Sequence, residues 1–199
     1  SITSCKDHCL SERERENIVV CHVTKDAPAV TRELERRFTI SSACGICGTD
    51  QIDDLKNRGC SHLEKPKLSI EELAKLPELM RARQNIFDKT GGLHAAALFD
   101  ENGNLKVIRE DVGRHNAVDK VIGWALMQNL IPLKGWSLTI SGRGGFEIVQ
   151  KSVAAGLSAM ISVSAPTSLA VETAREFNLT LLGFARDGKA TIYSPDPGN

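Results

Sequence analysis

The chain has 199 residues, of which 41% are hydrophobic and 25% are charged, an ordinary composition for a globular protein. Lys and Arg together number 25, as do Asp and Glu, so the zero net charge gives no reason to expect a nucleic acid or a membrane surface as partner. No apolar run approaches the roughly 20 residues that a membrane span requires. Six unevenly spaced cysteines do not match a secreted disulfide framework, and we therefore expect a reduced, cytoplasmic protein.

The first part of the chain, residues 1–67, is predicted to be an N-terminal segment separate from a main domain at 68–199. It is mostly polar before its cysteine-rich loop. An apolar run at 18–23 and a shorter one at 38–40 are strand candidates. These short elements predict an appendage rather than a second full domain.

The most distinctive feature of this segment is the pair of thiols Cys44 and Cys47, in the sequence Cys-Gly-Ile-Cys-Gly. A short helix is predicted directly after them, over residues 49–58, ended by Gly59. The free N–H groups and the dipole at a helix N-terminus favour a thiolate over a thiol. Such a pair can attack sulfur, carry a persulfide or bind a soft metal, and the residues alone leave this choice open.

The main domain begins with a helix signal. Ser69-Ile-Glu-Glu72 is a capping box, and the helix that it opens is expected to break or restart at Pro77 and to run on to about Asp88. Apolar runs on either side of an Asn-Gly turn predict a β-hairpin over 95–108. Apolar residues on one face predict a helix over 116–128.

The rest of the domain alternates between strands and helices. Strands are predicted at 137–140, 159–163, 180–184 and 190–193, and helices at 146–155 and 168–177. Strands separated by helices imply a sheet that is parallel at its centre. The predicted fold class is therefore α/β, with a mixed or mostly parallel central sheet.

In such sheets ligands bind beyond the carboxyl ends of the strands, where three segments carry suggestive residues. The loop 141–145 has glycines that allow close approach and Arg143, which could bind a phosphate, although a tight turn is the alternative. The loop 164–168 has hydroxyls that either cap the next helix or touch a ligand, and capping is the favoured interpretation. By itself the segment 184–189 is typical of a solvated turn.

The segment 109–116 is richer in polar side chains. Four of them could form an acid/base or substrate-orienting group: Asp111, Arg114, His115 and Asn116. Helix capping with a surface ion pair is the alternative. His94, shortly before, is favoured as a structural histidine rather than a site residue.

The thiols admit further alternatives. A structural zinc needs four ligands, and the spacing of Cys5, Cys9, Cys60 and His62 relative to the pair fits no common zinc finger. We therefore expect no metal site. A thioredoxin-like pair would lie within a small βαβ unit near the start of the chain, whereas this pair precedes the α/β region. A thiol pair in a loop suits the transfer of sulfur between proteins.

Five blocks of sequence, in order, together resemble the FdhD/NarQ family of formate dehydrogenase accessory proteins. The blocks are 41–48, 90–96, 109–120, 164–170 and 182–189. The resemblance implies a sulfurtransferase that accepts sulfur from a cysteine desulfurase as a persulfide on the CxxC. It further implies that this sulfur is passed to the molybdenum cofactor, bis(molybdopterin guanine dinucleotide), before the cofactor enters formate dehydrogenase.

The resemblance also assigns roles to residues. It makes Cys44 the persulfide carrier and Cys47 its partner. It assigns cofactor binding to Phe184, Ala185, Arg186, Asp187, Gly188 and Lys189. It implies a homodimer, and an N-terminal region that is longer in the family than in this chain, so that residues 1–67 are expected to be a truncated form.

The implied fold of the main domain is the three-layer, cytidine-deaminase-like fold, but deaminase chemistry is not expected. His94 is followed by Ala95 and Ala96 rather than Glu, and no Pro-Cys-x-x-Cys follows, so a catalytic zinc would lack its ligands.

The cofactor is a large anion, and four basic side chains suit its phosphates: Arg114, Arg143, Arg186 and Lys189. Two alternatives stay open. One is a chaperone that binds the molybdenum cofactor without transferring sulfur, and the other is a dithiol redox protein.

Overall fold

The computed structural model describes residues 2–16, 18–22 and 48–195, and the statements below refer to these residues. The chain forms two compact units, which divide between Cys44 and Gly45 and are described separately. The strand predicted at 38–40 and the two thiols Cys44 and Cys47 lie outside the described residues.

The first unit contains a two-stranded antiparallel sheet made of β1 (Ile2–Ser4) and β2 (Val19–Cys21). The β2 strand lies within the apolar run at 18–23, as predicted. Between the strands lies a short helix, α1 (Glu12–Glu16). Ser11 begins this helix: its N–H and its hydroxyl both donate to the Glu14 carboxylate, 2.8 and 2.6 Å away.

The second unit is built on a six-stranded mixed sheet, with the strand order β4-β3-β5-β6-β7-β8. The strands are β3 (His94–Phe99), β4 (Leu105–Asp111), β5 (Ser137–Ile140), β6 (Ala159–Ser162), β7 (Thr180–Arg186) and β8 (Lys189–Ser194). The central strands β5, β6 and β7 are parallel, because helical crossovers connect them, and the other pairs are antiparallel. The α/β class and the mixed sheet are thereby confirmed.

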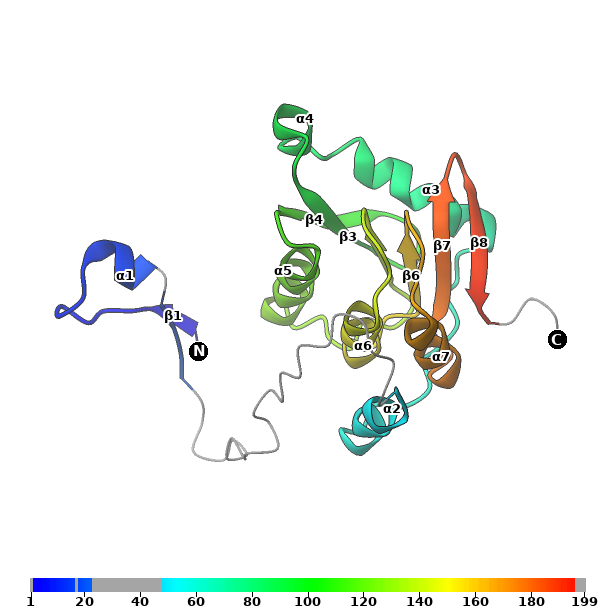
Figure 1. Cartoon of the computed structure of the whole chain (residues 1–199), viewed down its shortest axis with the longest axis horizontal. Helices are drawn as coiled ribbons and strands as arrows, with labels where there is room; N and C mark the ends of the chain where they lie inside the picture. Colours follow the sequence, from blue (N-terminus) through cyan, green and yellow to red (C-terminus); the bar gives the residue numbers. More distant parts are fainter. Residues whose placement is uncertain (1, 17, 23–47, 196–199) are drawn as a thin grey trace. The chain divides into compact units, whose positions relative to one another are not determined.

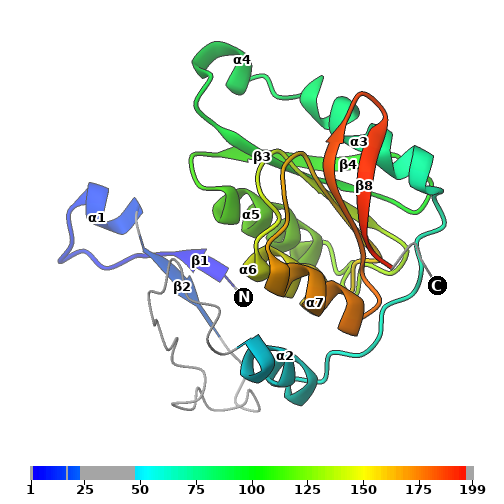
Figure 2. The same ribbon diagram turned by 45° about the vertical axis from the view of Figure 1, so that its right-hand side comes forward.

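Helices cover both faces of this sheet (Figures 1 and 2). One face carries α5 (Arg114–Met127), α6 (Phe146–Ala154) and α7 (Ser168–Glu176), and the other carries α3 (Ile70–Arg81). The arrangement therefore has three layers. The cytidine-deaminase-like identity of the fold stays a prediction.

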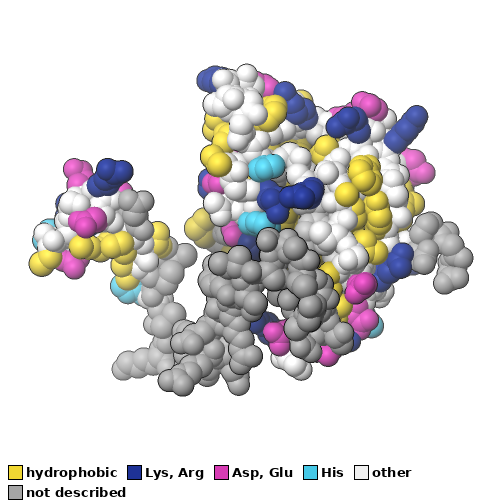
Figure 3. All heavy atoms as spheres, in the orientation of Figure 1, with side chains coloured by type: hydrophobic (Ala, Val, Ile, Leu, Met, Phe, Trp, Pro, Cys, Tyr) yellow, Lys and Arg dark blue, Asp and Glu magenta, His cyan; other side chains and the backbone are white. Residues whose placement is uncertain are grey.

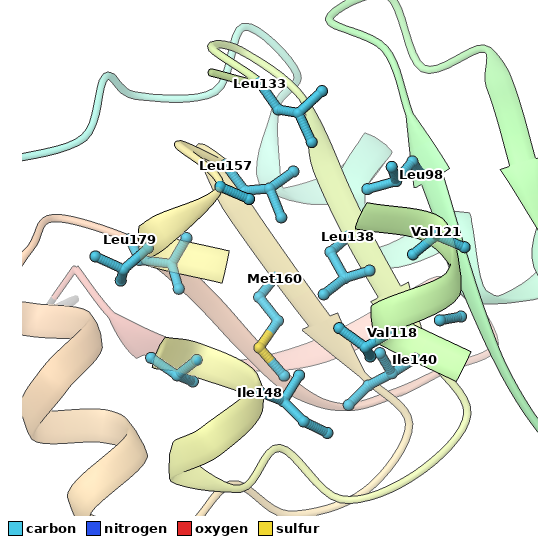
Figure 4. Close-up of a cluster of buried hydrophobic side chains, with 14 of the residues drawn as sticks. Leu98, Val118, Val121, Leu133, Leu138, Ile140, Ile148, Leu157, Met160 and Leu179 are labelled. Atoms are coloured by element: carbon cyan, nitrogen blue, oxygen red, sulfur yellow. The ribbon is translucent and has the colours of Figure 1, made fainter. Parts of the chain in front are cut away.

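The alternation of side chains along the strands produces two hydrophobic cores. In β3, Ala96 and Leu98 pack toward α5, α6 and α7, while Ala95 and Ala97 pack toward α3. Figure 4 shows the larger core, where Leu138 and neighbouring side chains of the sheet meet those of the covering helices. Burial on both faces explains why these strands are almost continuously apolar.

The helix α3 confirms one prediction and corrects another. Its capping box is present, with Ser69 accepting from the Glu72 N–H and the Glu72 carboxylate accepting from the Ser69 N–H. The helix does not break at Pro77, which lies inside it with its ring buried, so packing against the sheet offsets the lost hydrogen bond. It ends at Arg81, and a separate short helix, α4 (Phe87–Thr90), follows a turn.

The predicted helix after the thiols is confirmed as α2 (Gly48–Asn57), with Gly59 in the left-handed region that favours glycine. Leu55 of α2 is buried in the larger core, and Lys56 lies 2.5 Å from Glu176 at the end of α7. The second compact unit thus begins at Gly45, earlier in the chain than the predicted boundary between 67 and 68, because α2 packs on this unit.

The remaining predicted elements are confirmed to within a few residues, from the β3–β4 hairpin to β8. None of the helices in the described part of the chain is long and apolar enough to cross a bilayer.

Candidate functional site

A pocket of about 670 Å³ lies at the carboxyl end of the parallel strands. Ser141 follows β5, Val163 follows β6, and Ala185 lies near the end of β7, and all three line the pocket. This is the edge where ligands bind in α/β sheets. The pocket therefore lies where the sequence analysis places a binding site.

Half of the residues in the predicted cofactor-binding block 184–189 line the pocket. Ala185, Arg186 and Asp187 line it, whereas Phe184, Gly188 and Lys189 do not. Asp187 and Gly188 have positive φ angles of 53° and 67° and form the two-residue turn between β7 and β8. This tight turn holds the lining residues at the pocket edge.

Arg186 is the cation of this block that lines the pocket. Its side chain is exposed, and it forms no ion pair or hydrogen bond with any other residue that the structure describes. A guanidinium without a protein partner at a pocket edge suits a phosphate.

The loops after β5 and β6 are joined to each other. Gly144 pairs with Pro166, and the Thr167 N–H donates to the Gly144 carbonyl at 3.1 Å. Thr167 caps α7 by accepting from the Ala170 N–H, so the favoured capping interpretation of the 164–168 loop is confirmed. The loop 141–145 contributes Ser141 to the pocket, whereas Arg143 does not line it.

His94 lies in the pocket wall rather than in the protein core. It begins β3 and follows Gly91, Gly92 and Leu93, which also line the pocket. Since the expectation was a structural histidine, the structure moves His94 into the candidate site.

The opposite wall comes from the end of α3 and the start of α4, which the sequence analysis did not assign to a site. Its members include Met80, Gln84 and Phe87. One signal could have revealed this wall: in the helix predicted to run to about Asp88, the apolar residues at 73, 76 and 80 are followed at helical spacing by the polar Gln84, although α3 itself ends at Arg81.

Glu110 holds this wall in place. Its carboxylate accepts from the backbone N–H groups of Ile86 and Phe87, at 3.0 and 2.7 Å, and so ties the start of α4 to β4. Arg81 adds a second tie, since it bonds to Asp88 at 2.7 Å and lies 4.9 Å from the centre of the Phe87 ring.

Replacing Glu110 with Ala is therefore expected to loosen the α4 wall, because two N–H groups lose a charged acceptor, at a cost of about 1–3 kcal/mol. Hydrogen exchange of a peptide spanning residues 82–92 should speed up, and the Glu110→Gln variant, which keeps one acceptor oxygen, should be intermediate. Glu101→Ala, in the β3–β4 turn, is the control and should leave this peptide unchanged. Unchanged exchange in Glu110→Ala would show that the contact does not hold the wall.

Asp111 anchors the start of α5. Its carboxylate accepts from the Gly113 N–H at 2.8 Å, from the Asn116 amide at 3.1 Å and from Lys120 at 2.5 Å. Lys120, the Gly113 N–H and the Asn116 amide hold the pKa of Asp111 at about 2, below its ordinary value of 3.8. For Asp111 and Asn116, the alternative of capping and an ion pair is thus the one that the structure supports.

This lowered pKa predicts a pH dependence. Because the folded pKa is below the unfolded one, the contribution of Asp111 to stability is complete above about pH 5 and is lost as the pH falls toward 2. At pH 6 the Asp111→Asn variant should unfold at a lower urea concentration than the wild type, and the gap should close as the pH is lowered. A gap that is constant with pH would mean that the charge of Asp111 is not what stabilises the turn.

Arg114 and His115 lie beside the pocket rather than in it. A Cβ added to Gly142 would lie 3.5 Å from Cδ of Arg114 and 3.4 Å from Nδ1 of His94, so both side chains pack against this glycine. Nε of Arg114 is buried and has no hydrogen-bond partner among the described residues. Figure 3 shows histidine and Lys or Arg side chains gathered on one face of the molecule.

His115 has a different environment. Its Nε2 lies 3.2 Å from the Glu147 carboxylate. Burial, with Arg114 nearby, lowers the pKa of His115, and Glu147 opposes this shift. A mainly neutral imidazole is therefore expected at neutral pH.

Among the described residues, no group of three or more His, Cys, Asp or Glu side chains could hold a metal ion. Cys60 is a free, half-buried thiol that packs against the larger core. Burial raises the pKa of its thiol, so it is a poor nucleophile at neutral pH.

The fold and the pocket define an α/β protein with a ligand site at the carboxyl edge of its parallel strands. The model of the FdhD/NarQ family matches residues 2–197, and the chain belongs to this family. The family resemblance of the five sequence blocks is thus confirmed.

Similar proteins are found in bacteria and archaea. Over 164 residues the chain is 48% identical to a sulfur carrier protein FdhD from Streptomyces avermitilis and 45% identical to one from Mycolicibacterium paratuberculosis, with 81% of the chain covered in each case. A 45% identical sulfur carrier protein FdhD from Picrophilus torridus covers 80% of the chain. The chain spans 58%, 60% and 61% of the lengths of these relatives.

A solved structure is also similar. A crystal structure of a formate dehydrogenase accessory protein from Desulfotalea psychrophila superposes with a TM-score of 0.62 at 26% sequence identity. The match covers 73% of the chain and 59% of that protein.

Proposed function

We propose that this protein is a sulfur carrier for formate dehydrogenase, which accepts a persulfide on Cys44 and passes its sulfur to bis(molybdopterin guanine dinucleotide) bound in the pocket. One observation carries the proposal. Segments that are distant in the sequence, at 91–94, 141 and 185–187, line a single pocket in a chain that belongs to the FdhD/NarQ family.

The pocket has the features that one end of this cofactor requires. Its volume of about 670 Å³ lies within the usual range for ligand pockets and suits one heterocyclic ring system with its adjoining phosphate. Met80, Phe87 and Leu93 provide an apolar surface for the ring, and Arg186 provides a cation for the phosphate.

The proposed chemistry begins with the Cys44 thiolate, which attacks the outer sulfur of a persulfide on a cysteine desulfurase. The sulfur–sulfur bond of the donor breaks, and the donor cysteine leaves as a thiolate. In the release step the Cys47 thiolate attacks Sγ of Cys44, and sulfide leaves with the electron pair of the broken bond. The two cysteines then form a disulfide, which a thiol reductant must reduce before the next cycle.

The helix α2 supports this chemistry, since its first residue, Gly48, follows Cys47 directly in the chain. A helix N-terminus stabilises negative charge within about one turn, which favours the thiolates that both steps require. The proposal further includes a homodimer, a cytoplasmic location and transient association with the desulfurase and with formate dehydrogenase.

The test uses sulfur transfer itself. The protein is loaded with a cysteine desulfurase and radiolabelled L-cysteine, freed of small molecules and mixed with molybdenum cofactor released from a formate dehydrogenase. The proposal predicts that the label moves from the protein to the cofactor. Cofactor that binds without gaining label would contradict it and would support the chaperone alternative.

A further inference from the structure

The six-stranded sheet has two open edges, one at β4 and one at β8. No further strand in the described part of the chain pairs with the outer side of either. The outer backbone groups of an edge strand can form hydrogen bonds with a strand of another molecule, and this leads to unwanted association. The side chains beside β4 show how its edge is protected.

The register of β4 identifies its outward-facing groups. The strand pairs antiparallel with β3 from Leu105 to Asp111. In an antiparallel ladder, every second residue directs its N–H and its carbonyl away from the neighbouring strand. The carbonyls of Ile108 and Glu110 fit this spacing, and both accept hydrogen bonds from side chains. These two residues therefore form the outer edge of β4.

Two cations occupy these carbonyls. Nη1 of Arg109 donates to the Ile108 carbonyl at 2.8 Å, and Nζ of Lys120, from α5, donates to the Glu110 carbonyl at 3.3 Å. Lys120 is held in position by the Asp111 carboxylate, 2.5 Å away. Arg109 is exposed and forms no ion pair with any residue that the structure describes. A charged donor on a carbonyl competes with the neutral N–H of an incoming strand.

The opposite edge of the sheet has a similar contact. Nε of Arg175, from α7, donates to the Tyr193 carbonyl of β8 at 3.1 Å. A cationic side chain thus covers a backbone carbonyl at each of the two open edges. A single contact of this kind would be an ordinary surface hydrogen bond, whereas its repetition at both edges points to protection of the edges.

The sequence of β4 defines the partner that its edge would accept without the cations. When two β4 strands pair antiparallel about a twofold axis at Ile108, residue 106 of one copy lies opposite residue 110 of the other. Lys106 and Glu110 carry opposite charges, and opposite charges across a strand pair stabilise the pair. The edge is therefore complementary to itself, and the partner that it fits is a second copy of this chain.

We propose that Arg109 and Lys120 close the edge of β4 to pairing with β4 of a second copy. An incoming strand needs the outward carbonyls of Ile108 and Glu110 as acceptors for its own N–H groups, and it must displace both cations to reach them. The inference does not depend on the proposed function, and a homodimer formed through another surface is compatible with it.

The experiment measures the association of the whole chain by sedimentation velocity over a range of protein concentrations. Arg109→Ala uncovers the Ile108 carbonyl and leaves the contact between Lys120 and Asp111 intact, so the variant should keep its fold. It should self-associate about tenfold more strongly than the wild type, because an incoming N–H no longer competes with a charged donor. Adding Lys120→Ala should strengthen the association further.

Lys106→Ala is the matched control, since it removes one positive charge from the same strand and leaves both carbonyls covered. It should associate as the wild type does. Lys106→Glu, added to Arg109→Ala, tests the register: it sets two acidic side chains opposite each other and should return the association to the wild-type level. Hydrogen exchange of a peptide spanning residues 104–112 locates the contact, because pairing protects the outer N–H groups of β4.

Stronger association of Arg109→Ala, with slower exchange in β4 and reversal by Lys106→Glu, supports the inference. Association equal to that of the wild type at every concentration overturns it. Association that leaves the exchange of β4 unchanged also overturns it, because the contact then lies on another surface. Association that Lys106→Glu does not reverse contradicts the pairing of β4 with β4.

Discussion

On the proposed sulfur-carrier function, replacing Cys44 with Ala is expected to lower formate dehydrogenase activity by about two orders of magnitude or more, because loss of the proposed nucleophile would remove the covalent step altogether. The measurement is formate dehydrogenase activity in cells whose own accessory protein has been deleted and replaced by this one. Cys47→Ala should still accept sulfur from the desulfurase but should release it slowly, since no neighbouring thiol displaces the sulfide.

Cys60→Ala is the control for the loss of a thiol. Cys60 is half-buried against the core, and burial raises the pKa of its thiol, so it should not carry sulfur. Its variant should support activity within about twofold of the wild type. Equal damage in Cys60→Ala and Cys44→Ala would contradict the assignment of the carrier thiol.

Replacing Gly183 with Ala is expected to lower the free energy of unfolding by about 1–3 kcal/mol and to weaken ligand binding at the pocket. The added Cβ would lie 2.8 Å from Cε2 of Tyr193 and 2.9 Å from Cδ of Pro166, and the ring of Pro166 cannot rotate away. Either β8 or the loop after β6 must shift, and both flank the strand that carries Ala185 and Arg186 into the pocket. Urea unfolding and GDP titration measure the two effects.

Gly123→Ala is the matched control. In α5 the added Cβ meets no atom within 4 Å, so the substitution should stabilise the protein by about 0.5–1 kcal/mol through helix propensity alone. If Gly183→Ala were as stable as the wild type and bound GDP equally well, the close packing of β7 against Pro166 would not matter for the site.

Much of the fold is predictable because its signals are local. The capping box at Ser69, the Asn-Gly turn after β3 and the Asp187-Gly188 turn each specify a short stretch of backbone. The apolar strands separated by helices predict the parallel centre of the sheet. The helix break predicted at Pro77 is wrong for a physical reason. The backbone hydrogen bond that a proline removes is evident from the local sequence, whereas the burial that offsets this loss depends on a sheet formed by residues further along the chain.

The candidate site is predictable only in part. The block at 184–189 and the loop after Ile140 follow strand ends, so the rule for α/β sheets locates them. The wall formed by Met80, Gln84 and Phe87 comes from the end of α3, the turn after it and the start of α4, and α3 packs on the opposite face of the sheet from α5, α6 and α7. No local sequence pattern predicts that this wall lies beside the strand ends. The one indication in the sequence is the polar Gln84, which follows apolar residues at helical spacing.

The residues 109–116 show how a polar cluster divides into separate roles. Glu110 holds the pocket wall, Asp111 anchors the α5 turn, and Arg114 reaches Gly142 beside His94. Sequence alone cannot separate these roles, because each depends on which element lies opposite. These residues therefore contribute to the pocket wall and to the start of α5, while the acid/base role considered for the cluster stays a prediction.

The most direct test of the sulfur-carrier account is a peptide mass spectrum taken after the protein has been incubated with a cysteine desulfurase and L-cysteine. The account predicts that the peptide containing Cys44 and Cys47 gains the mass of one sulfur atom, that reduction removes it, and that Cys44→Ala does not acquire it. A peptide that stays unmodified while a known acceptor is loaded in the same reaction would contradict the account, as would sulfur found on Cys60 instead.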